Sequence, residues 1–361
     1  MNVPDLAYKP DAADACARME AWWNRAVLDR PAVQVCAPCP NGVPWPQREH
    51  ATIRDRWLDV EFAVESFAAS AANTWWGGEI LPGFFPNLGP EIMTAAMGAP
   101  VEFGAHTSWS VPNLHDWADV PGLAVDLESF YWQKILDLTR LGLERGRGLF
   151  LTGLTDLHPG GDLAASLRDP QQFALDCVDS PDQVTALLSQ IRPSFKACYE
   201  SQYQLMLAAG QTITTSWLPA FAEGRYYIPS NDFSCMVSQT MFREYFLDEL
   251  VEECEWLDHS IYHLDGPGAI RHLDALLEIE ALDAIQYVIG AGKEPASRWM
   301  HVFKKAQDGG KSLHISTTID DIEPFMAELK PEGVMLSLWA PSIAEGEAVI
   351  RRIAGWTRAG S

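Results

Sequence analysis

Short apolar runs alternate along the chain with longer stretches in which apolar residues recur every three or four positions. Apolar runs without internal alternation are typical of parallel strands that are covered on both faces. The predicted strands are Ala32–Ala37, Val101–Val111, Gly148–Leu154, Thr212–Leu218, Ser260–Leu264, Ala284–Ile289, Leu313–Ser316 and Val334–Leu338.

The three-to-four spacing indicates amphipathic helices between these runs. The predicted helices are Asp11–Leu28, Ile53–Ala72, Glu91–Met97, Asp126–Arg145, Pro170–Val178, Pro181–Ala209, Gln239–Leu257, Ala269–Leu277, Pro295–Asp308, Ile319–Leu329 and Ile343–Trp356.

Parallel strands need crossover connections, and the predicted helices supply them. Closing such units into a ring leaves no exposed sheet edge. We therefore predict an α/β fold, a (β/α)8 TIM barrel that forms a single domain over residues 1–361 with an N-terminal helical extension. An open doubly wound sheet is the alternative, although no G-x-G-x-x-G motif follows a strand as a nucleotide-binding version would require.

The formal net charge of −23 changes the range of partners that the fold suggests. Nucleic acids and anionic membranes are bound through lysine and arginine, so we expect neither as a partner. No apolar run is long enough for a membrane span and the N-terminus has no secretory signal, so the expected location is the cytoplasm. A small neutral or cationic substrate fits this net charge. The sequence leaves the oligomeric state open, and a homodimer is compatible with it.

In this fold the active site lies at the C-terminal ends of the strands. One strand runs into the motif YHLDG, in which His263 and Asp265 share a face because strand side chains alternate. Such a pair can ligate a metal, act as a base with its orienting group, or be a buried structural pair. We predict that His263, Asp265 and Asp232 are catalytic, with His263 and Asp265 as candidate metal ligands.

Polar side chains also follow other strands. The segment TDLHPGGD after Gly148–Leu154 combines an imidazole with two carboxylates, which equally fits a hydrogen-bonded turn. The loop after Thr212–Leu218 contains acid, guanidinium and phenol groups, and a histidine lies in the strand Leu313–Ser316. The candidate substrate-binding residues among these are Asp156, His158, Glu223, Arg225, Tyr227 and His314.

Tryptophan is unusually frequent, with fourteen in the chain. Indole rings bury large areas and often serve core packing, but their faces also form walls for flat or cationic ligands. The candidates for such a wall are Trp75, Trp76, Trp109, Trp217 and Trp339.

Several segments in order resemble the uroporphyrinogen decarboxylase superfamily, which includes corrinoid-dependent methyltransferases. They are PDQVTALLSQI, YIPSNDFSCMVSQTMFREYFLDEL, SIYHLDG and HLDALLEIEALDAIQYVIGAG, and the likeness is continuous from about Asp126 onward. NLGPEIMTAAMG and TDLHPGGDLAASLRDP indicate a further branch of that superfamily. The resemblance implies a (β/α)8 barrel, in agreement with the strand and helix pattern.

The chain departs from both known branches. Uroporphyrinogen decarboxylases have an arginine-containing loop after the first strand, whereas CPNGVPWPQREH here holds only Arg48. The methyltransferases bind zinc through a His-x-Cys pair and a later cysteine. His263 matches the histidine, but Asp265 stands at the cysteine position and the last cysteine is Cys254.

The resemblance implies methyl transfer from a small methylated substrate, with a corrinoid protein or a pterin as methyl partner. A cofactor-independent decarboxylase or lyase acting on a small polar or sugar-like compound is the alternative, and a non-catalytic binding barrel is a third. The cofactor stays open between zinc or another divalent metal and a corrinoid carried by a partner protein.

Overall fold

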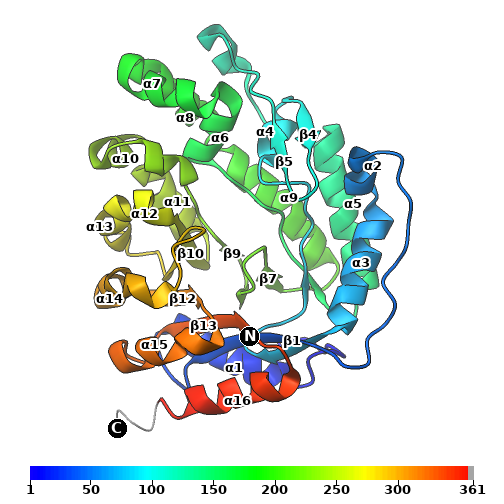
Figure 1. The fold of residues 1–361 in the computed structure, drawn as a ribbon. Coiled ribbons are helices and arrows are strands. Elements are labelled where there is room, and N and C mark those ends of the chain that lie inside the picture. The colour runs from blue at the N-terminus through cyan, green and yellow to red at the C-terminus, as the bar shows by residue number, and fades with distance from the viewer. Residues whose placement is uncertain (357–361) are drawn as a thin grey trace.

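The computed structural model describes residues 1–356, and helices surround the strands on several sides (Figure 1). The α-helices are α1 (Ala12–Trp23), α2 (Ile53–Leu58), α3 (Val60–Ala72), α4 (Ile92–Ala96), α5 (Phe130–Arg145), α6 (Gly160–Arg168), α7 (Pro170–Asp179), α8 (Pro181–Ile191), α9 (Ser194–Ala208), α10 (Gln239–Tyr245), α11 (Leu247–Trp256), α12 (Gly266–Ala269), α13 (Leu273–Leu277), α14 (Met300–Asp308), α15 (Ile322–Glu328) and α16 (Ile343–Ala354). Short 3-10 helices include η2 (Asp232–Met236) and η5 (Ile319–Asp321).

The largest sheet has seven strands in the order β2-β1-β13-β12-β11-β10-β9. All of its neighbouring pairs are parallel except β1 with β2. Three two-stranded sheets join β3 to β6, β4 to β5, and β7 to β8. The strands are β1 (Ala32–Pro38), β2 (Thr74–Gly78), β3 (Gly83–Phe84), β4 (Val101–Phe103), β5 (Ser108–Ser110), β6 (Leu151–Thr152), β7 (Ile213–Thr215), β8 (Phe221–Glu223), β9 (Tyr226–Tyr227), β10 (His259–Asp265), β11 (Ala284–Val288), β12 (Ser312–Ser316) and β13 (Val334–Trp339).

The two faces of the large sheet are buried in different apolar clusters. Val33, Ile285 and Leu313 belong to the larger cluster, which lies between the strands and the surrounding helices. The alternate residues Ile261 and Ala284 belong to a smaller cluster that includes α1. Trp23 of α1 stacks on His259 at the start of β10, and Trp22 O accepts a hydrogen bond from Ser312 at the start of β12, so α1 covers the N-terminal ends of these strands.

The α/β fold that we predicted is present, but one continuous barrel sheet is not. Within residues 1–356, the strand ladders leave the large sheet and the β3–β6 pair as separate sheets. Two backbone hydrogen bonds bridge the shorter strands, from Gly153 N to Phe84 O at 2.7 Å and from Leu154 N to Thr215 O at 2.9 Å. The closed (β/α)8 ring therefore stays a prediction.

Three predicted helices are each divided into two α-helices by local backbone chemistry. Asp59 interrupts the first, because its side chain caps the N-terminus of α3 by accepting a hydrogen bond from Phe62 N. Pro193, which has no backbone N–H, separates α8 from α9. Phe246, with φ −120° and ψ −24°, separates α10 from α11.

Other elements differ in direction or were not predicted. The predicted strand Val101–Val111 is an antiparallel hairpin of β4 and β5, and β2 runs antiparallel to β1. The expectation of parallel neighbours throughout was therefore wrong. Helix α6 was not predicted because it begins at Gly160 and Gly161, which have low helix propensity. No helix within residues 1–356 combines the length and apolarity that crossing a membrane requires.

A capping serine gives a first test of this fold. Ser342 precedes α16, and its Oγ accepts a hydrogen bond from Glu345 N at 3.3 Å and donates one to Glu345 Oε2 at 2.8 Å. Replacing Ser342 with alanine is expected to lower the free energy of unfolding by about 1 kcal/mol. Ser129→Ala is the matched control, because Ser129 precedes α5 without a side-chain capping bond. Equal losses in the two variants, measured by chemical denaturation, would contradict the prediction.

Candidate active site

Side chains from separate strands meet where the parallel strands end. His158 comes from the segment after β6, Trp217 from the segment after β7, and Asp232 from the segment after β9. His263 lies in β10, next to the edge strand β9. The rings of Trp217 and His263 meet edge to face with centroids 5.1 Å apart. His263 Nε2 is 3.9 Å from Asp232 Oδ1.

A second set of contacts extends from Asp232 to His158. Asp162 joins them, because its two carboxylate oxygens accept hydrogen bonds from the backbone N–H groups of Asp232 at 3.0 Å and Phe233 at 2.8 Å. His158 Nδ1 is 3.5 Å from Asp162, and His158 Nε2 is 3.0 Å from Asp156. We call the residues Asp156, His158, Asp162 and Asp232 the acid–histidine cluster.

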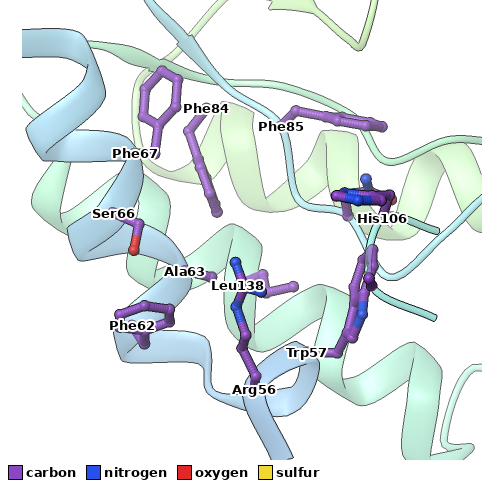
Figure 2. Close-up of a pocket in the computed structure, with 12 residues that line it drawn as sticks. Arg56, Trp57, Phe62, Ala63, Ser66, Phe67, Phe84, Phe85, His106 and Leu138 are labelled. Atoms are coloured by element: carbon purple, nitrogen blue, oxygen red, sulfur yellow. The ribbon is translucent and has the colours of Figure 1, made fainter. Parts of the chain in front are cut away.

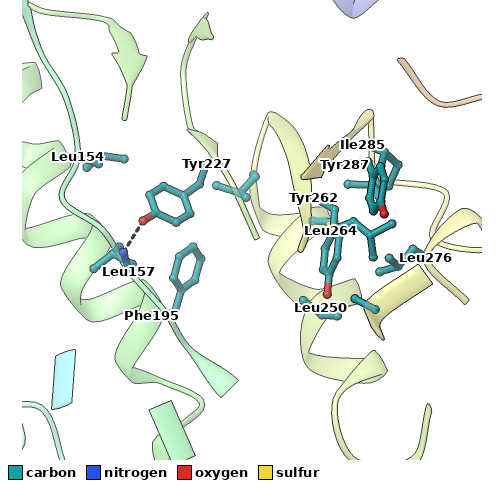
Figure 3. Close-up of a cluster of buried hydrophobic side chains, with 14 of the residues drawn as sticks. Leu154, Leu157, Phe195, Tyr227, Leu250, Tyr262, Leu264, Leu276, Ile285 and Tyr287 are labelled. Carbon is teal, nitrogen blue, oxygen red and sulfur yellow. Dashed lines mark hydrogen bonds between the residues drawn. The ribbon is translucent and has the colours of Figure 1, made fainter. Parts of the chain in front are cut away.

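Glycines and a buried tyrosine hold the segment that carries this cluster. Gly160 has φ +58°, and a Cβ atom there would lie 2.9 Å from Glu249, so the turn into α6 requires glycine. Tyr227 is fully buried in β9. Its hydroxyl donates to Thr155 O and accepts from Leu157 N, as Figure 3 shows for the second bond. Tyr227 therefore shapes the backbone beneath His158.

Charge keeps His158 protonated. Burial alone would lower the pKa of its imidazole, but Asp156 and Asp162 outweigh burial and hold that pKa well above 6.5. The pKa of Asp232 is raised to about 6, first by burial and then by the negative charge of Asp162. The charges of His263 and His158 oppose this rise. Asp232 can therefore gain or lose a proton close to neutral pH.

His263 is held by a different partner from the one that the sequence suggested. Its Nδ1 lies 2.7 Å from Gln286 Oε1 on β11, directly opposite in the strand register. Asp265 is exposed at the end of β10. His263 thus faces Gln286, Asp232 and Trp217, while Asp265 lies at the rim.

Two buried glutamates lie behind the acid–histidine cluster and were not among the site residues predicted from the sequence. Glu249 and Glu253 lie one turn apart on α11, and both are almost fully buried. Burial raises the pKa of Glu249 to about 7, and burial with Glu249 and Asp162 raises that of Glu253 well above its ordinary value. The helical spacing places both glutamates on the same face as Leu250 and Cys254, and this spacing could have predicted that they are buried.

A cavity of about 310 Å³ lies against the acid–histidine cluster. Its volume falls within the usual range for small-molecule sites. Its lining combines polar side chains, those of Glu91 and of His158, Asp162 and Asp232 from the cluster, with apolar ones, among them Met93, Phe233 and Met236. A small ligand with one polar end fits this arrangement.

The protonation of His158 can be tested directly. With its pKa held above 6.5, His158 should carry both ring protons at pH 7. We expect ¹⁵N chemical shifts of the histidine ring to report imidazolium for His158 at pH 7. Asp156→Asn should move its titration to lower pH. A neutral His158 ring at pH 7 in the unmodified protein would contradict the arrangement.

Two predicted substrate-binding residues lie at the opposite ends of the strands. Glu223 accepts hydrogen bonds from the backbone and side chain of Asn2. Arg225 precedes β9, pairs with Glu200 at 2.9 Å and lies over the ring of Trp256 at 4.9 Å. The physical reason is the β7–β8 hairpin, which returns the chain to the N-terminal end before β9 begins.

Three of the tryptophans that were predicted to form a ligand wall lie in separate places in the structure. A Cβ atom on Gly346 of α16 would lie 2.5 Å from the Trp75 ring, so this indole packs against α16. Trp76 donates to Ala71 O, and the exposed Trp109 donates to Glu102. None of these three indoles lines the cavity beside the cluster.

His314 and Trp339 lie nearer to the site. His314 is buried between strands, with Nε2 3.2 Å from Gln34, and burial lowers its pKa to about 4. Trp339 ends β13 and is exposed at the same end as the cluster. His314 therefore belongs to a polar layer below the cluster, and Trp339 to the rim above the strands.

Metal-binding capacity also differs from the sequence prediction. Among residues 1–356, one group of three potential ligands has its ligand atoms within 4.8 Å of one another, and it is His158, Asp162 and Asp232. The predicted His263–Asp265 pair is not part of it. One imidazole and two carboxylates suit a divalent cation. The thiolate zinc site of the methyltransferases does not fit, because this group contains no cysteine.

No family model and no curated protein matches the sequence. Among solved structures, the chain is similar to a methyltransferase from Methanosarcina mazei. The sequences are 13% identical, the alignment covers 95% of this chain and 99% of the methyltransferase, and the TM-score is 0.57. At this identity the likeness establishes a common fold that spans both chains nearly end to end.

Proposed function

We propose that the chain is a single-domain methyltransferase-type enzyme of the uroporphyrinogen decarboxylase superfamily, built on a (β/α)8-type barrel. The observation that carries the proposal is the meeting of Asp232 with His158, Asp162 and His263 at the C-terminal strand ends. This is the position at which barrels of this type place their active sites. The shared fold with a methyltransferase supports the same reading.

The substrate is a small neutral or cationic methylated compound. The cavity beside the cluster offers about 310 Å³ and is lined by the carboxylates of Glu91, Asp162 and Asp232 and by apolar side chains. Carboxylates attract a cationic head group, and the apolar wall accepts methyl groups. A corrinoid carried by a partner protein, or a pterin, is the methyl partner in this proposal.

Asp232 handles the proton in the proposed reaction. A methylated oxygen or an amine nitrogen with a lone pair becomes a better leaving group when it is protonated, and the C–O or C–N bond then breaks with its electron pair on that atom as the methyl group passes to the methyl acceptor. With a pKa of about 6, Asp232 can supply that proton near neutral pH. His158 and Asp162 position Asp232, Asp162 by holding the backbone at the start of η2. His263 and Trp217 close the other side of Asp232.

In their deprotonated forms, His158, Asp162 and Asp232 would be the ligands of a divalent cation, which would displace the proton from His158. A bound cation would supply Lewis-acid activation of a substrate oxygen or nitrogen.

A cofactor-independent decarboxylase or lyase is the second candidate. The same raised pKa of Asp232 favours it, because a carboxylic acid near neutral pH can protonate a carbanion. A small polar acid would then take the place of the methylated compound.

One experiment separates the two. The purified protein is incubated with cob(I)alamin and small methyl donors: methylated amines and methyl ethers. We expect methylcobalamin to form with at least one of them, followed by absorbance, in parallel with and without EDTA. Absence of methylcobalamin with every donor, together with carbon dioxide release from a small polar acid in corrinoid-free buffer, would replace the first candidate with the second.

A further inference from the structure

A second cavity lies away from the acid–histidine cluster, between α2, α3 and the segments around Phe85 and His106 (Figure 2). Its volume is about 460 Å³, larger than the cavity beside the cluster. None of the cluster residues lines it. It is therefore a binding site candidate separate from the cavity beside the cluster.

The walls of this cavity are aromatic and held in place. Phe67 contacts Phe84 with ring centroids 5.5 Å apart and Phe150 at 5.0 Å. Trp57 is fixed by a hydrogen bond from its indole to Gly104 O at 2.9 Å. A preformed aromatic cavity loses little conformational entropy when a flat ligand enters it.

The acidic side chains of α2 and α3 are already engaged. Asp55 accepts hydrogen bonds in the capping box at the start of α2. Asp59 and Glu65 both accept from Arg48, at 2.9 Å and 3.1 Å, and Glu61 lies 3.8 Å from the same guanidinium. Their charges are therefore compensated without Arg56.

Arg56 itself has no such partner. Arg56 is exposed, and within residues 1–356 its guanidinium forms no ion pair or hydrogen bond, although the chain carries a net charge of −23. Figure 2 shows Arg56 reaching from α2 toward Leu138, with Phe62 on one side and Trp57 on the other. His106 is drawn between Phe85 and Trp57 in this view and adds a second nitrogen donor to the lining.

We propose that this cavity binds a planar aromatic anion, such as an aromatic carboxylate. Its rings would stack among the phenylalanine and tryptophan side chains, and its charged group would pair with Arg56. Guanidinium favours carboxylates because it presents two parallel N–H donors. The site differs in charge from the acid–histidine cluster, which suits cations, so the two cavities select different ligands. This proposal does not depend on the proposed function.

Isothermal titration calorimetry with 2-naphthoate tests the site, with the neutral 2-naphthylmethanol as matched ligand. We expect the unmodified protein to bind 2-naphthoate more tightly than the alcohol. Arg56→Gln should weaken 2-naphthoate about tenfold or more, since a hydrogen bond to a charged group is lost, and should leave the alcohol unchanged. Arg54→Gln is the control on the same helix, because Arg54 lies over Phe130 and Tyr131 instead.

Filling the cavity gives an independent measurement. Ser66 and Ala63 line it from α3, so Ser66→Phe and Ala63→Phe should each abolish binding of 2-naphthoate. Circular dichroism identifies the variant that keeps its fold. Absence of 2-naphthoate binding by the unmodified protein, equal affinity in Arg56→Gln, or undiminished binding by a folded filled variant would each overturn the proposal.

Discussion

Replacing Asp232 with asparagine is expected to lower the rate of the proposed methyl transfer by about 100- to 10,000-fold, the range typical for loss of a general acid or base. The reason is specific to this carboxyl group. Burial and Asp162 raise its pKa to about 6, and asparagine keeps its shape while removing the proton that it can donate. Its backbone N–H would still bind Asp162, so the fold of η2 should survive.

The pH profile distinguishes proton transfer from a structural role. If the protonated form of Asp232 is the active one, kcat/KM of the unmodified protein should fall about tenfold per pH unit above pH 6, as the carboxyl group loses its proton. That pH dependence should disappear in Asp232→Asn. Asp320→Asn, an exposed acid that also follows a strand of the large sheet, is the control. A normal rate with an unchanged profile in Asp232→Asn would remove this residue from the mechanism.

Much of the central sheet could be predicted from sequence because its strands are continuous apolar runs. The strands β1, β11, β12 and β13 begin and end within a residue or two of the predicted bounds. The strand β6 occupies two residues of the predicted strand Gly148–Leu154, whereas β3 and β9, also of two residues each, are too short for any periodicity. Their pairing depends on partners far away in the chain, which local sequence does not specify.

The site was harder to predict because it too depends on contacts between segments that are far apart in the chain. The polar segments after β6 and β9 were recognised as chemistry-bearing, but their contact through Asp162 depends on how these segments pack together. Arg225 was misplaced because a hairpin reverses the chain between β7 and β9. The residues that follow the strands lie at one end of the sheet only where all of these strands run in the same direction.

The largest expected loss of stability comes from a buried ion pair below the sheet. Glu79 is fully buried, and Arg30 donates two hydrogen bonds of 2.6 Å to its carboxylate. The backbone N–H of Val33 donates a third at 2.8 Å. Glu79→Ala should lower the free energy of unfolding by about 3–5 kcal/mol, because it leaves the Arg30 charge buried without its partner.

The matched comparison is a pair with the same geometry on the surface. Arg243 donates two hydrogen bonds of 2.7 Å to Glu278, and both side chains are exposed. Solvent already stabilises these charges, so Glu278→Ala should change stability little in chemical denaturation. Removing both buried charges together, as in Arg30→Met with Glu79→Leu, should recover much of the loss, since no unpaired charge remains. Equal losses from Glu79→Ala and Glu278→Ala would contradict the prediction, because burial would then not decide the cost of removing the carboxylate.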